Sequence, residues 1–316
     1  MKHFTSAADA PDPWALVQEA LDIKKAPFAH DTLGKNKVLG MIFFNSSLRT
    51  RMSTTRAAYN LGMQVMTLNV TQDSWQMETQ DGAIMDKGNA EHIKEAIPVM
   101  AGYCDMLAVR SFPSLVDREK DYQEMILQSF VTLANKPIIN LESATLHPLQ
   151  SLADLMTIKE FSAKDRPKVV LSWAPHVKAL PQAVPNSFAQ WMLAANVDLT
   201  ITHPKGMELA PQFTAGAHIE HNQLKALERA DFVYVKNWSG YENYGQLHHD
   251  PKWIMNLEKL QVTNQAKIMH CLPVRRNVVI ADDVLDSPHS IVQEQAYNRL
   301  FAAQAVLKHI LKSNPS

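Results

Sequence analysis

The densest run of groups able to hold an anion lies at Ser46 to Arg51, in the segment FFNSSLRTRMS. This run follows a predicted strand and opens a predicted helix, where free backbone N–H groups and the positive end of the helix dipole meet. The hydroxyls of Ser47 and Thr50 add donors, and the planar guanidinium of Arg49 can bind two phosphate oxygens at once. A capped helix with surface arginines has the same local sequence, so phosphate binding and simple capping both remain open here.

Two further runs each begin with a histidine. The string HPLQSLADLMT begins at His147, and histidine is the side chain best able to hydrogen-bond a carbonyl near neutral pH. The string HCLPVRR begins at His270 and contains the thiol of Cys271. No base partner for a cysteine nucleophile is implied, and a lone histidine before proline is more often an ordinary loop residue.

The hydrophobic pattern predicts the elements that position these runs. Apolar runs typical of strands alternate with helical patterns along both halves of the chain, which indicates parallel sheets with crossover helices. We predict strands at 37–44, 65–70, 106–109, 138–139, 168–173, 197–201, 232–235 and 267–269. We predict helices at 14–23, 53–61, 91–100, 122–133, 152–161, 187–195 and 292–311. The expected fold is α/β, with two doubly wound parallel-sheet domains (1–150 and 151–316), a cleft between them and the last helix packed back on the first domain.

Composition excludes several classes of protein. The chain has 316 residues, with 31 Lys plus Arg and 32 Asp plus Glu, so its net charge of −1 provides no global field for nucleic acid or an anionic membrane. The 2 cysteines cannot form a disulfide framework, and with no apparent signal peptide or membrane span we expect a cytoplasmic protein. Neither the Gly-x-Gly-x-x-Gly fingerprint nor a Gly-Lys-Ser/Thr loop occurs, which argues against a dehydrogenase or a kinase.

The segment after the first predicted strand resembles the carbamoyl phosphate loop of the aspartate and ornithine transcarbamylases. Their usual form is Ser-Thr-Arg-Thr-Arg, and Leu48 replaces the first threonine here. This departure changes a side chain and leaves the backbone donors in place. His-Pro-x-Gln at His147 and His-Cys-Leu-Pro at His270 are similar to two further motifs of the same family, so the resemblance covers the whole chain.

The resemblance implies roles for individual residues. In the family the histidine polarises the carbonyl and the glutamine contacts the carbamoyl amide, so we expect His147, Arg49 and Cys271 to be catalytic. The residues expected to contact carbamoyl phosphate are Ser47, Leu48, Arg49, Thr50, Trp75, Arg110, His147, Gln150, Arg275 and Arg299. Arg276 is expected to be structural, although the order of Arg275 and Arg276 could be reversed. No metal or organic cofactor is expected.

Trp75, in the segment TQDSWQMET, stands where related enzymes extend a loop into the active site of a neighbouring subunit. The resemblance therefore implies a homotrimer with active sites at subunit interfaces. Local packing of this tryptophan within its own chain is the alternative.

The acceptor is predicted from a difference between the second half of this chain and the ornithine transcarbamylases. Ornithine transcarbamylases carry Asp-x-x-x-Ser-Met-Gly, whose aspartate binds the free α-amino group, whereas this chain has VKNWSG at 235–240. Lys236 stands about where that acid would be, and a cation repels an ammonium group but attracts a carboxylate. The α-amine of the substrate is therefore expected to be acylated, as in the acylornithine branch of the family. The residues expected to bind the acylornithine are Glu142, His176, Lys178, Lys236, Cys271, Leu272 and Ala90.

The acyl group is predicted from two positions. Acetylornithine enzymes have Glu near the position of Ala90 and Lys near that of Val279, whereas succinylornithine enzymes have Pro at the first. Without that acid, a succinyl carboxylate is not repelled, and Lys178 could attract it. We expect carbamoyl transfer to N2-succinyl-L-ornithine, giving N-succinylcitrulline and phosphate in arginine biosynthesis. N-acetylornithine is the alternative acceptor, and a non-catalytic anion-binding protein on the same scaffold is a second alternative.

Overall fold

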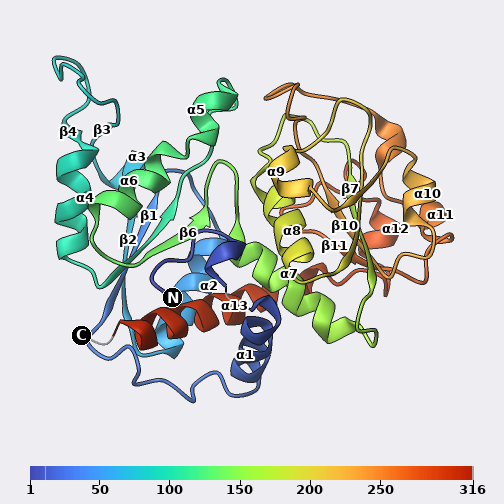
Figure 1. Cartoon of the computed structure of the whole chain (residues 1–316), viewed down its shortest axis with the longest axis horizontal. Coiled ribbons are helices and arrows are strands. Elements are labelled where there is room, and N and C mark those ends of the chain that lie inside the picture. The colour runs from blue at the N-terminus through green and yellow to red at the C-terminus, as the bar shows by residue number, and fades with distance from the viewer. Residues whose placement is uncertain (11, 315–316) are drawn as a thin grey trace.

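The computed structural model describes residues 1–10 and 12–314. Two α/β units lie side by side, each built around a parallel sheet (Figure 1). The first sheet contains β1 (Val38–Phe43), β2 (Gln64–Asn69), β5 (Met106–Arg110) and β6 (Ile138–Glu142) in the order β2-β1-β5-β6. The second contains β7 (Lys168–Trp173), β8 (Asp198–Thr202), β9 (His218–Glu220), β10 (Phe232–Lys236) and β11 (Lys267–Met269) in the order β11-β10-β7-β8-β9. The predicted fold class is confirmed.

Helices surround both sheets, and a short strand pair stands apart from them. The helices of the first half are α1 (Pro13–Lys25), α2 (Arg49–Asn60), α3 (Val70–Asp73), α4 (Ile93–Gly102), α5 (Arg118–Tyr122), α6 (Met125–Leu133) and α7 (Pro148–Phe161). Those of the second half are α8 (Ala183–Ala194), α9 (Pro211–Thr214), α10 (Gln223–Leu227), α11 (Leu257–Leu260), α12 (Asp282–Leu285) and α13 (Val292–Ser313). The separate pair is β3 (Met77–Glu78) with β4 (Glu91–His92). None of the helices in the described ranges is both long and apolar enough to cross a membrane.

Burial on both faces explains why the strands are apolar throughout. In β1, Leu39, Met41 and Phe43 belong to one core cluster, whereas Ile42 belongs to the cluster on the opposite face. Strands covered by helices on both sides have near-continuous hydrophobic sequences rather than alternating ones, as KVLGMIFF does.

The last helix connects the two halves. The helix α13 contacts α1, α2 and α7, and its Gln304 accepts a 3.0 Å hydrogen bond from Asn60 of α2 (Figure 1). A single core cluster includes Met41 of the first sheet and Leu171 of the second. The domain boundary at residues 150 and 151 falls inside α7 and stays a prediction.

Several helices differ from those predicted, and α7 and α8 each begin four residues before the predicted start. The helix predicted at 53–61 begins at Arg49, because the polar run before Ser53 continues the helix instead of forming a loop. The segment predicted as one helix at 122–133 is two, separated by Glu124, whose φ of 52° lies in the left-handed region. The short, partly exposed strand β9 was not predicted, since it lacks the apolar run typical of a buried strand.

Candidate active site

A cavity of about 700 Å³ lies between the two halves. It opens at the carboxyl ends of the strands, where α/β sheets bind their ligands: Arg110, Glu142 and Lys236 are the last residues of β5, β6 and β10. The lining residues are Ser46, Ser47, Leu48, Arg49, Thr50, Arg110, Phe112, Glu142, His147, Gln150, His176, Lys178, Leu180, Pro181, Val184, Lys236, Cys271, Leu272, Pro273, Val274, Arg275 and Arg299. Among them Glu142 is the only acid, so the cavity favours an anionic ligand.

The first turn of α2 faces this cavity without a side-chain cap. Leu48 occupies the N-cap position with helical torsions, and no side chain there caps the helix. A non-polar N-cap leaves the first backbone N–H groups of the helix free for a ligand. The Leu48 side chain is 67% exposed, so its replacement of a polar residue alters the rim of the cavity rather than its packing.

Arginines from three separate elements converge behind this turn. Arg299 of α13 donates to the hydroxyl of Thr50, which leaves the hydroxyl proton of Thr50 free for a further acceptor. Burial lowers the pKa of Arg299 to about 10, and the pKa of Arg49 is also lowered, chiefly by burial. The Nε atoms of Arg49 and Arg110 are buried without a hydrogen-bond partner. Buried donors of this kind are costly unless a ligand accepts from them, which fits a phosphate site.

Glu142 and His147 face each other next to the arginines. The Glu142 Oε2 atom accepts from Arg110 and lies 3.5 Å from Nε2 of His147. Burial, followed by the charges of Arg299 and Arg110, holds the pKa of His147 well below its usual value. The imidazole is therefore neutral at pH 7, with one N–H to donate and one nitrogen able to accept.

Gln150 is held by a carboxyl group that the sequence analysis did not identify. Its Nε2 donates to Oδ1 of Asp154 at 2.7 Å, and Gln295 of α13 donates to the same oxygen at 2.7 Å. The Oε1 atom of Gln150 is buried without a partner. The amide therefore presents an acceptor to the cavity, which suits the NH2 of a carbamoyl group. The four-residue spacing between Gln150 and Asp154 indicates this contact in the sequence, because residues four apart on a helix share one face.

The loop before His147 depends on a second acid, the half-buried Glu124. Glu124 accepts hydrogen bonds from the Ser143 hydroxyl and from the backbone N–H groups of Ala144 and Thr145. The loop joins Glu142 to His147, so Glu124 fixes the distance between these two site residues. No sequence motif marks Glu124, since its partners lie about twenty positions further along the chain.

Cys271 and Leu272 lie on the opposite side, after β11. Burial raises the pKa of the Cys271 thiol, so it is protonated at neutral pH and is a poor nucleophile. Leu272 has a φ of 55°, a strained conformation for a branched residue. Its N–H donates to Nδ1 of His270 at 2.9 Å, and the backbone N–H of His270 donates to Gln295. Gln295 thus connects this segment to Asp154 and Gln150.

The second domain supplies cations to the acceptor side. Lys236 is buried and its Nζ donates to the Asn237 carbonyl at 3.1 Å. His176 is also buried, and burial lowers its pKa, whereas Lys178 is exposed at the rim. This arrangement can hold one carboxylate inside the cavity and a second at its edge.

Several predicted residues require separate comment. Trp75 and Ala90 are exposed on the segment around β3 and β4, away from the cavity of this chain, and the indole N–H of Trp75 donates to Glu91 at 2.9 Å. Arg275 lines the cavity, whereas Arg276 pairs with Asp282 and Asp286. Val279 is buried in the core of the second domain and is not part of the cavity lining.

Among the lining residues that were not predicted, Phe112 lies beside Arg110. The ring of Phe112 lies 4.3 Å from the guanidinium carbon of Arg110, an arrangement that orients the cation through its interaction with the ring face. Its place two positions after Arg110 gives the only hint in the sequence.

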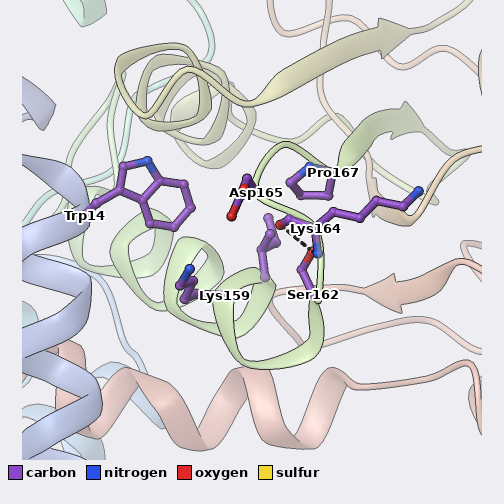
Figure 2. Close-up of a pocket in the computed structure, with 7 residues that line it drawn as sticks. Trp14, Lys159, Ser162, Lys164, Asp165 and Pro167 are labelled. Carbon is purple, nitrogen blue, oxygen red and sulfur yellow. Dashed lines mark hydrogen bonds between the residues drawn. The ribbon is translucent and has the colours of Figure 1, made fainter.

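A smaller cavity of about 170 Å³ lies beside Trp14, Lys159 and Asp165 (Figure 2). Its polar groups serve the local chain: the Ser162 hydroxyl accepts from the N–H of Lys164, and Lys164 pairs with Asp231. With Ser162 and Lys164 engaged in local contacts, this small cavity is a weaker candidate for catalysis.

Comparison with known proteins gives matches in both halves. Residues 2–160 match the aspartate/ornithine carbamoyltransferase carbamoyl-P binding domain, and residues 181–310 match the Asp/Orn binding domain of the same family. The N-succinylornithine carbamoyltransferase of Bacteroides thetaiotaomicron is 53% identical over 99% of both chains. The N-acetylornithine carbamoyltransferase of Xanthomonas campestris pv. campestris is 34% identical over 97% of both chains. A crystal structure of acetylornithine transcarbamylase complexed with acetylcitrulline is 32% identical, with a TM-score of 0.92 over 98% of this chain and 99% of that one.

Proposed function

The chain belongs to the aspartate/ornithine carbamoyltransferase family, and from this we propose that it carbamoylates the side-chain amine of N2-succinyl-L-ornithine. The donor is carbamoyl phosphate, and the products are N-succinylcitrulline and phosphate, as a step of arginine biosynthesis. The observation that carries the succinyl acceptor is the 53% identity with an N-succinylornithine enzyme over nearly the whole chain, against 34% with an N-acetylornithine enzyme.

We propose that the donor phosphate binds at the first turn of α2. The free backbone N–H groups, the hydroxyls of Ser47 and Thr50 and the guanidinium of Arg49 would bind its oxygens. Arg110 and Arg275 complete the cation set that lines the cavity. Together these groups neutralise the phosphate and favour its departure.

The carbamoyl group would then lie against His147, Arg299 and Gln150. The neutral imidazole of His147 and the Arg299 guanidinium donate to the carbonyl oxygen, where negative charge develops in the transition state. The free Oε1 of Gln150 accepts from the carbamoyl NH2 and fixes the plane of the group. These contacts stabilise the transition state more than the ground state, which lowers the barrier.

The acceptor amine would approach from the second domain. The Leu272 carbonyl and the Cys271 thiol orient the δ-amine towards the carbonyl carbon, while Lys236 and His176 bind the α-carboxylate. The new C–N bond forms a tetrahedral intermediate, the C–O bond to phosphate breaks, and one amine proton leaves with the phosphate. Glu142 stands beside the reacting groups, and Lys178 at the rim attracts the succinyl carboxylate.

We further propose that the working unit is a homotrimer, with Trp75 and Ala90 contributing to the site of a neighbouring subunit. The support is their exposure on a segment that projects from the body of the first domain (Figure 1). An exposed large aromatic ring that points away from its own site is suited to contact another chain. A cytoplasmic location is supported by the two free, buried thiols Cys104 and Cys271.

Steady-state kinetics with both acyl acceptors test the function. At saturating carbamoyl phosphate, kcat/KM for N-succinylornithine should exceed that for N-acetylornithine, since Lys178 offers the second carboxylate a partner. A preference for N-acetylornithine would contradict the succinylated acceptor but not the carbamoyl transfer itself. No citrulline product from either acceptor, with a folded protein, would leave the non-catalytic alternative.

A further inference from the structure

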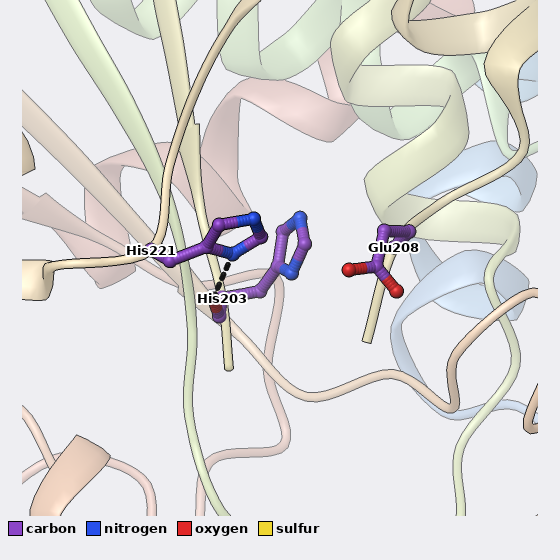
Figure 3. Close-up of side chains that lie close together, drawn as sticks. All are labelled: His203, Glu208 and His221. Carbon is purple, nitrogen blue, oxygen red and sulfur yellow. Dashed lines mark hydrogen bonds between the residues drawn. The ribbon is translucent and has the colours of Figure 1, made fainter. Parts of the chain in front are cut away.

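Two histidines and a glutamate gather in the second domain outside the cavity between the halves (Figure 3). His203 directly follows β8, His221 directly follows β9, and Glu208 lies in the loop between them. One potential ligand atom from each residue lies within 4.8 Å of the others. Adjacent parallel strands therefore bring these three side chains to one edge of the sheet.

Backbone contacts select one tautomer of each imidazole in its neutral form. Nδ1 of His203 lies 2.9 Å from the Pro204 carbonyl, and Nδ1 of His221 lies 3.1 Å from the His203 carbonyl. A carbonyl only accepts, so each Nδ1 carries the proton and each Nε2 keeps its lone pair. Metal-binding histidines are oriented by the same kind of contact, in which the second ring nitrogen donates to a backbone carbonyl.

The carboxylate is also held in place. Glu208 Oε1 accepts from the N–H of Gly206 at 3.1 Å, and Figure 3 shows the His203 ring between His221 and Glu208. The two imidazole rings are 5.0 Å apart between centroids and nearly perpendicular, so they do not stack and fill the space between them. The group thus combines two imidazoles with one carboxylate.

We propose that His203, Glu208 and His221 form a binding site for a divalent transition-metal ion of the Zn²⁺ class. Two imidazoles and a carboxylate are a ligand set that zinc accepts, with water completing the coordination. Ligands about 2.1 Å from a tetrahedral ion lie roughly 3.4 Å apart, so binding draws the three groups together. Glu208 is exposed and can move inward by side-chain rotation, whereas His203 is buried and provides the fixed ligand.

The site would stabilise the loop that supports the acceptor side of the cavity. The Trp238 indole N–H donates to the Met207 carbonyl at 2.7 Å, and the Tyr241 N–H donates to the Glu208 carbonyl at 2.7 Å. Trp238 follows Lys236 by two residues, so the metal-binding loop packs behind the lysine proposed to bind the substrate carboxylate. The ion takes no part in carbamoyl transfer, and its effect is on the stability of the second domain.

Equilibrium dialysis against ZnCl₂, with metal analysis, tests the site. The wild type should bind one more Zn²⁺ per chain than His221→Ala or Glu208→Gln, whose residues are exposed and can be replaced without opening the core. His249→Ala removes another exposed histidine and should bind as the wild type does. In His221→Ala and Glu208→Gln the affinity of this site for Zn²⁺ should fall at least tenfold, by analogy with the roughly 10- to 100-fold cost of losing a partner that orients a metal ligand.

Thermal unfolding with and without ZnCl₂ provides the second measurement. Zn²⁺ should raise the Tm of the wild type and of His249→Ala, and it should raise the Tm of the two site variants less. Circular dichroism without metal checks that the variants are folded. The proposal is overturned if the wild type binds no zinc, or if both site variants match it in stoichiometry, affinity and Tm shift.

Discussion

The two walls of the cavity differ in how their polar groups are held. On the first-domain wall, Thr50, Arg110 and His147 are at most 7% exposed, and each contacts another polar side chain of the site. On the second-domain wall Lys236 and His176 are also buried, but Lys178 is exposed at the rim. Buried groups with fixed partners cannot reorganise during a reaction, whereas exposed cations stay hydrated and can change conformation.

This difference assigns separate tasks to the two walls. Preorganised donors on the first wall suit the chemistry that all members of the family share, the activation of a carbamoyl phosphate. The exposed Lys178 at the rim of the second wall suits the choice of acceptor, because an exposed charge contributes little and can be altered at small cost. Changes on the first wall should therefore lower kcat strongly, and changes on the rim of the second should alter the preference between acceptors.

The largest effect is expected from His147→Ala. Removing one donor to a developing oxyanion costs about 10²- to 10³-fold in kcat, and the substitution should affect kcat far more than binding of the donor. Stopped assays of N-succinylcitrulline formation measure this, with circular dichroism to verify the fold. Turnover within twofold of the wild type would remove the imidazole from the proposed mechanism.

A smaller effect is expected from Trp75→Ala, which tests whether a neighbouring subunit contributes to the first-domain wall of the cavity. If the indole contacts the donor in a neighbouring subunit, kcat/KM should fall about tenfold, as loss of a hydrogen bond to a charged group does. Co-expression with His147→Ala should form mixed trimers, in which some sites combine an intact Trp75 with an intact His147. Activity of the mixture above that of both single variants supports the shared site, and strict additivity contradicts it.

Lys178→Ala should change selectivity by several-fold. An exposed cation at the rim attracts the succinyl carboxylate weakly, so kcat/KM for N-succinylornithine should fall about fivefold while that for N-acetylornithine changes little. Lys205→Ala removes another exposed lysine, outside the cavity, and serves as the matched control. Equal losses with both acceptors would show that Lys178 does not recognise the acyl group.

The smallest effect concerns stability, at the carboxyl group behind Gln150. Burial raises the pKa of Asp154 to about 7, above its usual value near 3.8. The folded state therefore binds more protons between these two pH values, and this group's stabilising contribution, complete below pH 3.8, is lost as pH rises to 7. Urea unfolding should show that the wild type loses stability relative to Asp154→Asn as the pH rises from 5 to 8. A difference that is constant with pH would mean that Asp154 ionises normally.

Much of the first wall was predictable from sequence because its groups follow strands directly. Arg110 and the run at Ser47 to Thr50 stand just after predicted strands, and parallel sheets bring such ends together, while His147 opens the helix that follows β6. The strand pattern alone thus predicts that these residues meet. The motif resemblance adds which chemistry they share.

The site residues that could not be predicted from the sequence depend on long-range contacts. Glu124 and Gln295 support the site from positions far along the chain, and neither stands in a recognisable motif. The helical pattern was recognised only from Ser53 because SSLRTR is polar, although this run was placed at the opening of the helix, and in the structure Arg299 contacts Thr50 in the first turn of α2. Trp75 and Ala90 lie outside the cavity of one chain, so their role depends on an assembly that neither one sequence nor one subunit describes.

A crystal structure with carbamoyl phosphate and N-succinyl-L-norvaline tests the central claim most directly. The account predicts the phosphate within hydrogen-bonding distance of Ser47, Thr50 and Arg49, at the first turn of α2. It places the carbonyl oxygen against His147 and the succinyl carboxylate towards Lys178. A donor bound elsewhere, or a carbonyl oxygen that His147 does not reach, would contradict it.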